Sequence, residues 1–252
     1  MRSHPFWSNH IPEGFMQLGV IEVPTLKELF VNKIKEQILS GNLSVGESLP
    51  SERQLVEETH ISKTMVHAGL VELERMGFVE ILPRRGTVVA NYAETGTMDT
   101  LKAVISHNGG RMTASQTRSF LDARIAIEGS ALRLVAENAT EEDMAYLEEK
   151  LAAAVKAAER LPFDSAELAE ALFNFQRAVC LKSQNEFFPL LYNEFKPIIM
   201  SFWAESIKTF GAEANVHLAS RYLDYIRQRD PDGAYNRLLR SVNEYLNCCL
   251  QQ

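Results

Sequence analysis

The stretch HISKTMVHAGLVELERMGF, residues 60–78, has the pattern of one amphipathic helix. Ser62 belongs to the residue types that cap helix N-termini, and Gly77 can end the helix in the left-handed backbone region. The first two turns are polar on one side, while apolar side chains recur at helical spacing on the other. The positions expected to face a core are Val66, Leu70, Leu73 and Met76.

Two further helices are predicted upstream. Residues 25–40 carry apolar side chains on one helical face, and the pattern ends at Gly41. A second helix begins after Ser51, because Gln54 follows at the spacing of a capping box. The apolar face expected for the first helix consists of Leu26, Leu29, Phe30, Ile34 and Ile38.

A β-hairpin is predicted after this helix. Two β-branched runs flank the tetrapeptide PRRG at residues 83–86. Gly86 can take the positive φ that a tight hairpin turn requires. Three short helices followed by a hairpin predict a winged helix-turn-helix.

The rest of the chain predicts a second, all-helical domain. Composition changes near residues 91–100, and helical periodicity dominates after them. The fold class is therefore mainly α: a winged helix-turn-helix followed by an antiparallel helical bundle large enough to enclose a cavity. We expect an N-terminal extension at 1–23, the winged domain at 24–92, a linker at 93–98 and the bundle at 99–252.

Local signals place several helices of the bundle. Residues 185–210 are expected to form one long apolar helix, with Pro189 in its opening turn and a kink at Pro197. Residues 118–139 show an apolar stripe of Leu121, Ile125, Ala131, Leu132 and Val135. Helix starts are expected at Thr140 with Asp143, at Asp164 with Glu167, and at Asp230 followed by Pro231.

The overall composition limits the class of protein. With 26 basic and 33 acidic residues the net charge is −7, so only a small face can be basic. Cys180, Cys248 and Cys249 form neither a disulfide framework nor a zinc spacing, which fits a reducing cytosol. No apolar run approaches the roughly 18 residues that span a bilayer. We therefore expect a cytoplasmic protein without a membrane segment.

A recognition helix contacts base edges and phosphates through its N-terminal residues. That role requires short donors and cations on the first two turns, as at Ser62, Lys63, Thr64 and His67. Residues 24–90 contain eight Lys or Arg and nine Glu, so the placement of the cations matters more than their number. For any single one of them, a solvated surface is the commoner explanation. Further cations stand on the elements that a winged helix presents to DNA: Arg53 at the preceding helix start, and Arg84 and Arg85 at the wing tip.

Residues 49–90, LPSERQLVEETHISKTMVHAGLVELERMGFVEILPRRGTVVA, resemble the DNA-binding domain of GntR-superfamily transcription regulators. The helical region resembles the ligand-binding domain of the FadR subfamily. The resemblance implies a homodimer that binds a short palindromic operator in double-stranded DNA and responds to a small-molecule effector. The positions that match family DNA contacts are Arg53, Ser62, Lys63, Thr64, His67 and Gly86.

The recognition helix departs from the family pattern. Lys63 and His67 stand where arginine is usual, so the bidentate fork that favours guanine or phosphate is lost. Ala68 and Gly69 replace the usual Glu-Ala, and Gly69 is expected to weaken the helix by about 1 kcal/mol. These departures predict an altered operator preference or weaker binding.

Many relatives of this kind hold a divalent metal with an aspartate and three histidines. The matching positions here are Leu172, Gln176, Ala219 and Ser241, none of which is a normal ligand for such a site. His217 lies two residues from one of them, but that spacing turns it by about 200° around a helix. The resemblance therefore implies neither a metal nor another cofactor.

The neutral polar residues in this region resemble those of the acyl-CoA-responsive members. Arg124 matches an inward-facing arginine of the family. It would pair either with an anionic ligand or with an internal carboxylate such as Glu128, and the two are about equally favoured. Candidate contacts to a carboxylate or acyl-CoA effector are Arg124, Asn174, Gln176 and Ser241. For Gln176 and Ser241, a polar residue satisfied within a helix interface is the slightly favoured alternative.

Two other classes of function stay open. The bundle could be an enzyme, although no phosphate loop, HExxH or Gly-x-Ser-x-Gly motif is present. Alternatively, a degenerate winged helix could bind protein instead of DNA. DNA binding is distinguished by a steep loss of affinity with salt.

Overall fold

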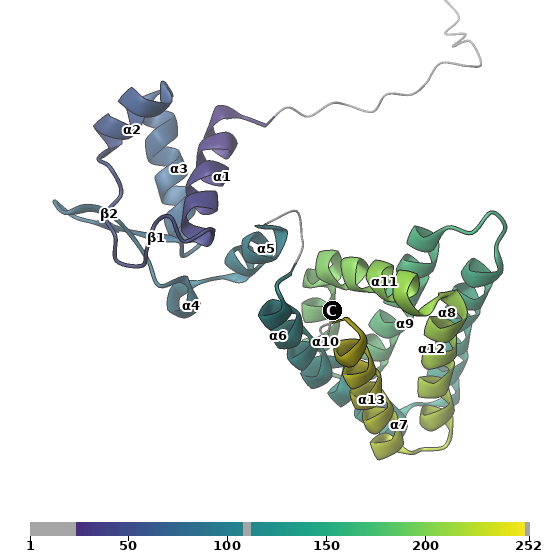
Figure 1. Cartoon of the computed structure of the whole chain (residues 1–252). Coiled ribbons are helices and arrows are strands. Elements are labelled where there is room, and N and C mark those ends of the chain that lie inside the picture. Colours follow the sequence, from purple (N-terminus) through teal and green to yellow (C-terminus); the bar gives the residue numbers. More distant parts are fainter. Residues whose placement is uncertain (1–23, 108–111, 250–252) are drawn as a thin grey trace, which may run out of the picture. The chain divides into compact units, whose positions relative to one another are not determined.

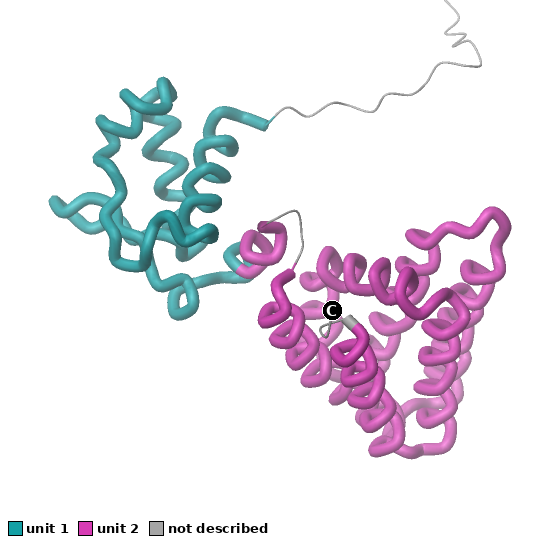
Figure 2. Tube along the Cα trace, viewed as in Figure 1, with its two compact units in different colours: residues 1–100 teal, residues 101–252 magenta. Residues whose placement is uncertain are grey.

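The computed structural model describes residues 24–107 and 112–249. The chain divides into two compact units, residues 1–100 and residues 101–252 (Figure 2). The expected N-terminal extension, residues 1–23, lies outside the described residues.

Unit 1 has the three helices and hairpin of a winged helix-turn-helix, as predicted (Figure 1). Thr25, Ser51 and Ser62 cap the helices, and each side chain accepts a hydrogen bond from a backbone N–H of the first turn. The elements in chain order are α1 (Leu26–Leu39), α2 (Glu52–Thr59), α3 (Lys63–Arg75), β1 (Val79–Leu82) and β2 (Gly86–Val89).

The wing is a tight antiparallel hairpin in which Leu82 pairs with Gly86. Arg84 and Gly86 have positive φ values of 65° and 90°, which confirms the conformation predicted for the glycine. The N–H of Ile81 donates to the Glu74 carboxylate of α3 at 2.8 Å. The wing is therefore tied to the helix that precedes it.

The buried face of α1 differs from the predicted one. Leu26 and Leu29 were expected in the core, but they are 53% and 50% exposed, so that part of the prediction is wrong. At 3.6 residues per turn, a face centred on Phe30 and Ile34 includes Val31 and turns Leu29 away. The buried residues of α1 are Phe30, Val31, Ile34 and Ile38.

Gly69 of α3 allows a close approach between α1 and α3. A Cβ at this position would lie 2.6 Å from a ring carbon of Phe30, whose side chain is buried. The glycine lowers helix propensity as expected, but it also makes room for the Phe30 ring. Its presence therefore has a packing reason that the sequence pattern did not indicate.

The segment expected to be a linker, residues 93–98, is largely helical in the structure. It contains most of α4 (Tyr92–Thr95) and the first residue of α5 (Met98–Ser106). The Thr95 hydroxyl donates to the Gly77 carbonyl at 3.0 Å, and the Thr100 hydroxyl donates to the Met76 carbonyl. Both bonds end at the C-terminus of α3, where Gly77 has the predicted positive φ.

Unit 2 is all-helical in its described residues, as predicted. The expected start signals are confirmed: Thr140, Asp164 and Pro231 stand at the beginnings of three helices. None of the described helices is long and apolar enough to cross a membrane. The elements are α6 (Ala114–Arg124), the π-helical turn η2 (Ile125–Gly129), α7 (Ser130–Asn138), α8 (Glu141–Glu159), α9 (Ser165–Lys182), α10 (Phe188–Glu194), α11 (Lys196–Phe210), α12 (Ala212–Arg227) and α13 (Pro231–Cys249).

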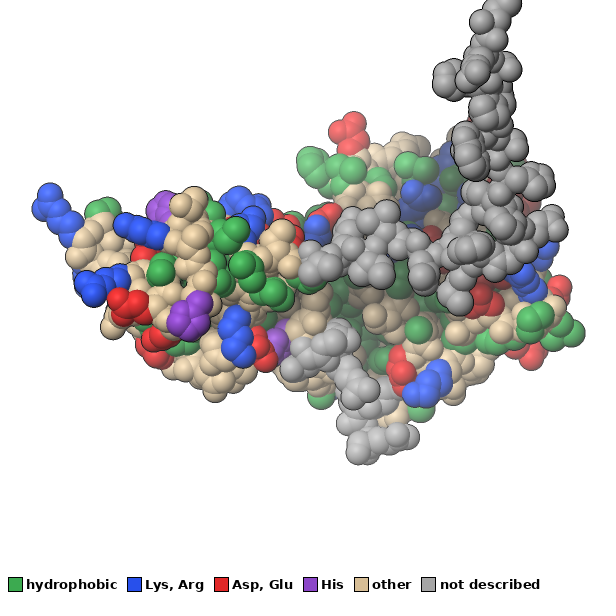
Figure 3. Space-filling view, turned by 90° about the horizontal axis from the view of Figure 1, so that it is seen from above, with side chains coloured by type: hydrophobic (Ala, Val, Ile, Leu, Met, Phe, Trp, Pro, Cys, Tyr) green, Lys and Arg blue, Asp and Glu red, His purple; other side chains and the backbone are tan. Residues whose placement is uncertain are grey.

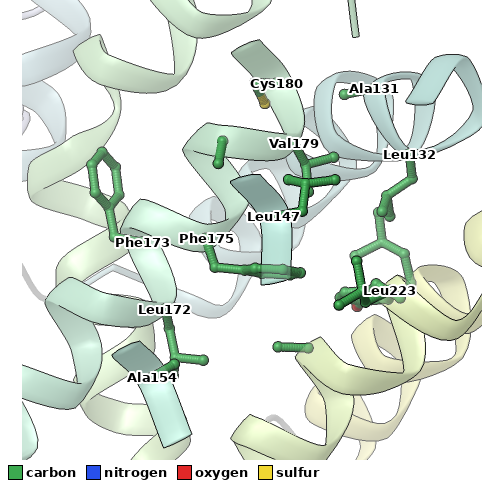
Figure 4. Close-up of a cluster of buried hydrophobic side chains, with 14 of the residues drawn as sticks. Ala131, Leu132, Leu147, Ala154, Leu172, Phe173, Phe175, Val179, Cys180 and Leu223 are labelled. Atoms are coloured by element: carbon green, nitrogen blue, oxygen red, sulfur yellow. The ribbon is translucent and has the colours of Figure 1, made fainter. Parts of the chain in front are cut away.

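The core of unit 2 is built around α9, which contributes side chains along most of its length (Figure 4). Leu172, Phe175 and Val179 are fully buried, and Leu147 of α8 and Leu223 of α12 also belong to this core. Such interdigitated apolar packing is the main source of helix stability in a bundle.

Residues 185–210 do not form one kinked helix. The helix stops at Glu194, and a new one begins at Lys196 with Pro197 in its first turn. Proline lacks the N–H that would bond to the carbonyl four residues back, so it suits a helix start better than an interior. Pro189 lies in the first turn of α10, as predicted.

The π turn η2 joins α6 and α7, and it carries a buried pair of opposite charges. Arg124 and Glu128 are 3% and 1% exposed, whereas Ile125 of the predicted apolar stripe is only partly buried. Charged side chains are rarely buried unless they are paired. Here Arg124 and Glu128 are each other's partner, which allows both side chains to be buried.

Candidate DNA-binding surface and buried polar centre

The N-terminal turns of α3 present the polar side chains that the sequence predicted for DNA contact. Ser62 caps the helix, and its hydroxyl accepts a hydrogen bond from the Met65 N–H. Lys63, Thr64 and His67 are all exposed. The opposite face of α3 is buried and contributes Val66, Leu70 and Leu73 to the core of unit 1. One face of the helix therefore packs and the other is exposed to solvent.

The other predicted cations are also exposed. Arg53, in the first turn of α2, is 88% exposed and forms a salt bridge with Glu57 on its own helix at 2.9 Å. Arg84 and Arg85 are exposed at the wing tip beside Gly86. Figure 3 shows Lys and Arg side chains spread over unit 1, with acidic side chains among them. On the face shown, the cations of unit 1 are interspersed with acidic side chains.

A contact between α2 and α3 was not foreseen. His67 Nδ1 lies 2.8 Å from a carboxylate oxygen of Glu52. A carboxylate accepts, so this geometry requires a proton on Nδ1. In the neutral imidazole, Nε2 is then an acceptor, and protonation would turn it into a donor. The spacing of fifteen residues between Glu52 and His67 gave no local signal for the pair.

In unit 2, Arg124 lies at the centre of a buried polar region. Its Nε donates to Glu128 Oε1 at 2.7 Å, so the internal carboxylate expected as one of two partners for this arginine is in contact with it. Its guanidinium also lies over the rings of Phe202 and Trp203, at 4.5 and 5.0 Å from their centroids. Burial alone would lower the pKa of Arg124, but the charge and the hydrogen bond of Glu128, together with Tyr222 and Tyr192, outweigh burial and raise it.

Several polar atoms in this region are buried without a hydrogen-bond partner among the described residues. Arg124 and Glu128 each keep one such atom, although they are joined to each other. The atoms are Arg124 Nη2, Glu128 Oε2, Gln176 Nε2 and Oε1, Tyr192 OH and Trp203 Nε1. These five residues are called the polar centre below.

Two cavities adjoin Arg124. The smaller one, about 20 Å³, is lined by Arg124, Glu128 and Tyr192 among others. The larger one, about 100 Å³, is lined by Arg124, Trp203 and Ser241 among others. Ser241 lines the same cavity as Arg124, and its hydroxyl donates to the Leu238 carbonyl at 2.7 Å.

Gln176 faces the same region from α9. On this helix it lies between Phe173, whose ring stacks on Tyr192 at 5.1 Å, and Cys180, whose pKa is raised mainly by burial and also by Glu128. Asn174 is turned away from this face, and its amide donates to Glu170 at 3.4 Å. The structure thus brings Arg124, Gln176 and Ser241 toward one region and leaves Asn174 outside it.

The positions matched to metal ligands hold no grouped ligand residues. Leu172, Gln176 and Ala219 are buried, and no three His, Cys, Asp or Glu side chains within residues 24–107 and 112–249 are grouped to hold a metal. His217 lines a separate surface groove together with Phe210.

Comparison with known protein families decides the identity of the two units. Residues 26–89 match the family described as bacterial regulatory proteins, gntR family, and residues 119–244 match the FCD domain. This chain belongs to the GntR family. It is a DNA-binding transcription regulator whose second unit is an effector-binding FCD domain.

Two curated GntR-family relatives show how far the similarity extends. The transcriptional repressor NanR of Cronobacter sakazakii is 27% identical over 234 residues, which cover 86% of this chain and 83% of the relative. The Glc operon transcriptional activator of Escherichia coli is 30% identical over 166 residues, which cover 63% of this chain and 61% of the relative. Both are transcription regulators, which weighs against the enzyme alternative.

A solved structure of Lar, a protein that controls the agr system of Listeria monocytogenes, has a related fold. Its TM-score is 0.58 at 15% identity, with 92% of this chain and 99% of that chain covered. This similarity supports the fold alone.

Proposed function

We propose that this GntR-family regulator acts in the cytoplasm as a homodimer that binds a palindromic operator, under the control of a small-molecule effector in unit 2. The observation that carries the DNA-binding part is the division of α3 into a buried apolar face and an exposed polar N-terminal face. Lys63, Thr64 and His67 would contact base edges, and Ser62 and Gly86 would contact phosphates through the backbone.

The cations around α3 would anchor the domain on the phosphate backbone. Arg53 would exchange its contact with Glu57 for a phosphate, and Arg84 and Arg85 would reach the adjacent groove or backbone. A dimer would place two such domains on half-sites about one helical turn, roughly 34 Å, apart. The two-fold symmetry of such a dimer is the reason for expecting a palindromic operator.

The effector would bind beside Arg124, where buried donors and acceptors adjoin two cavities. A small effector that carries a carboxylate would be recognised through Arg124, Gln176 and Ser241. An acyl-CoA, the other class that the resemblance implies, is too large for cavities of about 20 and 100 Å³. Asn174 is part of the same proposal only if the ligand reaches the Glu170 side of α9. NanR is named a repressor and the Glc protein an activator, so relatives of both kinds exist. A reporter assay would decide whether this chain represses or activates transcription.

The test is binding of the purified chain to DNA fragments from around its own gene, across a salt series. We expect one discrete site and a log–log salt slope of about −0.9 for each phosphate contact. Weak binding with no preferred fragment would contradict the proposal and favour the alternative in which the winged helix binds protein.

A matched pair of variants tests the interface. Arg53→Ala should weaken binding to every fragment about equally and make the salt slope shallower by about one. The control is Lys33→Ala, because Lys33 is an exposed cation on α1 with a comparable salt bridge, to Glu36 at 3.3 Å. Equal DNA affinities of the Arg53→Ala and Lys33→Ala variants would show that Arg53 does not contact DNA.

A further inference from the structure

The polar centre contains more hydrogen-bonding capacity than its own side chains use. The Arg124 and Trp203 nitrogens can only donate, and the Glu128 carboxylate can only accept. The Gln176 amide and the Tyr192 hydroxyl can do both. Each of these atoms is buried and lacks a partner among the described residues. Because burial without a partner is unfavourable, the centre is suited to a ligand that brings both donors and acceptors.

The ion pair between Arg124 and Glu128 uses only one nitrogen and one oxygen. Arg124 Nε and Glu128 Oε1 are 2.7 Å apart, but Arg124 Nη2 and Glu128 Oε2 remain without partners. Each of these two atoms is bonded through one carbon to an atom of the joined pair. A cationic donor and an anionic acceptor therefore lie near each other, and both are buried without a partner among the described residues.

The charges of the centre are already balanced. Burial raises the pKa of Tyr192 well above its usual range and raises the pKa of Tyr222 to about 12, so both hydroxyls stay neutral. Burial likewise raises the pKa of Cys180, which stays a thiol. With Arg124 and Glu128 cancelling, a ligand with a net negative charge would leave a buried charge without compensation.

The larger cavity does not change this balance. Arg237 and Glu244, which also line it, lie 3.5 Å apart as a second pair of opposite charges. A ligand with no net charge would leave both pairs intact. A ligand with one charge of each sign would in addition form charge-assisted hydrogen bonds, which are about twice as strong as neutral ones.

The cavities also limit the size of the ligand. Their volumes of about 100 and 20 Å³ compare with a share of roughly 30 Å³ for one water molecule in the liquid. Pockets for drug-sized ligands measure about 300–1,000 Å³. A compact molecule of few atoms therefore fits with the least rearrangement, and a long acyl chain does not.

We propose that the polar centre binds a small zwitterion of the α-amino-acid class. Its carboxylate would accept hydrogen bonds from Arg124 Nη2 and Trp203 Nε1. Its ammonium group would donate to Glu128 Oε2 and to the Tyr192 hydroxyl, which lies near the Glu128 carboxylate. The inference rests on the proposed function, because the bound zwitterion is taken to be the effector that controls DNA binding.

The first measurement is thermal unfolding of the full chain with each of the twenty standard α-amino acids. For every one that stabilises, two matched probes follow: the same molecule without its amine, and the same molecule without its carboxylate. We expect at least one amino acid at saturation to raise the Tm by about 5 °C, and neither matched probe to do so. Equal stabilisation by the amine-free acid, or no stabilisation by any amino acid, would overturn the proposal.

Variants locate the binding site. Glu128→Gln and Tyr192→Phe should each weaken binding of the stabilising amino acid at least tenfold by calorimetry. Tyr192→Phe removes only a hydroxyl that has no partner, so it keeps the test available if Glu128→Gln does not fold. The control is Tyr146→Phe, because Tyr146 of α8 is partly buried against the same core but lines neither cavity. Unchanged affinity in both Glu128→Gln and Tyr192→Phe would exclude the polar centre.

Operator binding, measured on the same preparation, separates the two proposals. If the chain binds its operator but no amino acid, the ligand class is wrong and the regulator proposal stands. If an amino acid binds as described but leaves operator affinity unchanged, the site is supported and its role as effector site is contradicted.

Discussion

Glu52 lies beside the helix that would contact DNA, where a carboxylate is unexpected because its charge repels phosphate. Its oxygen holds His67 Nδ1 at 2.8 Å and so fixes the orientation of the imidazole. The neutral ring then offers Nε2 as an acceptor, which would match the amino groups that adenine and cytosine expose in the major groove. If His67 contacts bases as proposed, a single side chain of α2 would influence which bases α3 selects.

Glu52→Ala is expected to raise affinity for random DNA and to reduce the preference for the operator about tenfold. The variant removes a charge that repels phosphate, and it also frees the imidazole to rotate. Competition binding with operator and scrambled duplexes measures both effects. Glu58→Ala, an exposed position on the same helix, is the control and should keep the full preference.

Gln176→Met is expected to stabilise unit 2 by about 1–3 kcal/mol. The variant replaces an amide whose two polar atoms are buried without partners by an apolar side chain of similar length. Urea unfolding followed by circular dichroism measures the change. Gln116→Met is the opposite control, because it removes the side chain that accepts from the Thr113 N–H in a capping box and should destabilise. A loss of stability in Gln176→Met would mean that the amide has a partner.

At the scale of the helices, the approach of α1 to α3 depends on Gly69. Gly69→Ala improves helix propensity by about 1 kcal/mol, but the new methyl group would overlap the buried Phe30 ring. We expect a net loss of about 1–3 kcal/mol, measured by thermal unfolding. The double variant with Phe30→Leu should recover part of the loss. Stabilisation by Gly69→Ala alone would show that the two helices move apart easily.

The start of α8 should make stability depend on acid pH. The pKa of Asp143 is about 2, because Lys182 and then the Thr140 N–H donate hydrogen bonds to its carboxylate. Since this pKa lies below the unfolded value of about 4, the stabilisation is present above pH 4 and disappears as the pH falls toward 2. Asp143→Asn should therefore lower the Tm at pH 7 and converge with the unchanged protein near pH 2. Parallel Tm curves over that range would contradict this role.

At the scale of the chain, the segment after the wing is fastened to the end of α3. Thr100→Val removes the hydroxyl that donates to the Met76 carbonyl, so local opening of α5 should become easier. We expect tryptic cleavage after Lys102 to accelerate about fivefold. Thr64→Val, at an exposed position of α3, should leave the cleavage rate unchanged. Equal rates in the two variants would mean that the segment is held by other contacts.

The sequence predicted those features that depend on local patterns. The caps at Ser51 and Ser62, the glycine at Gly86 and the buried positions Val66 and Leu70 follow from turn chemistry and helical periodicity. These signals lie within a few residues of the element that they specify.

The features that were missed depend on contacts between distant segments. The pairing of Glu52 with His67 and the fit of Gly69 against Phe30 join residues from different helices, and periodicity contains no information about such pairs. The internal pairing of Arg124 with Glu128 was expected only as one of two alternatives, because a charged residue predicts exposure unless its partner is known.

The π turn between α6 and α7 predicts how the protein would respond to the deletion of a single codon. A π turn holds about one residue more than the α-helical turn that it replaces, so deleting one codon within residues 125–127 would leave an uninterrupted α-helix. The flanking segments, and with them the fold, should tolerate this deletion. It would change the spacing of Arg124 and Glu128 from four residues to three. A single in-frame deletion could therefore alter ligand recognition while leaving the DNA-binding unit untouched.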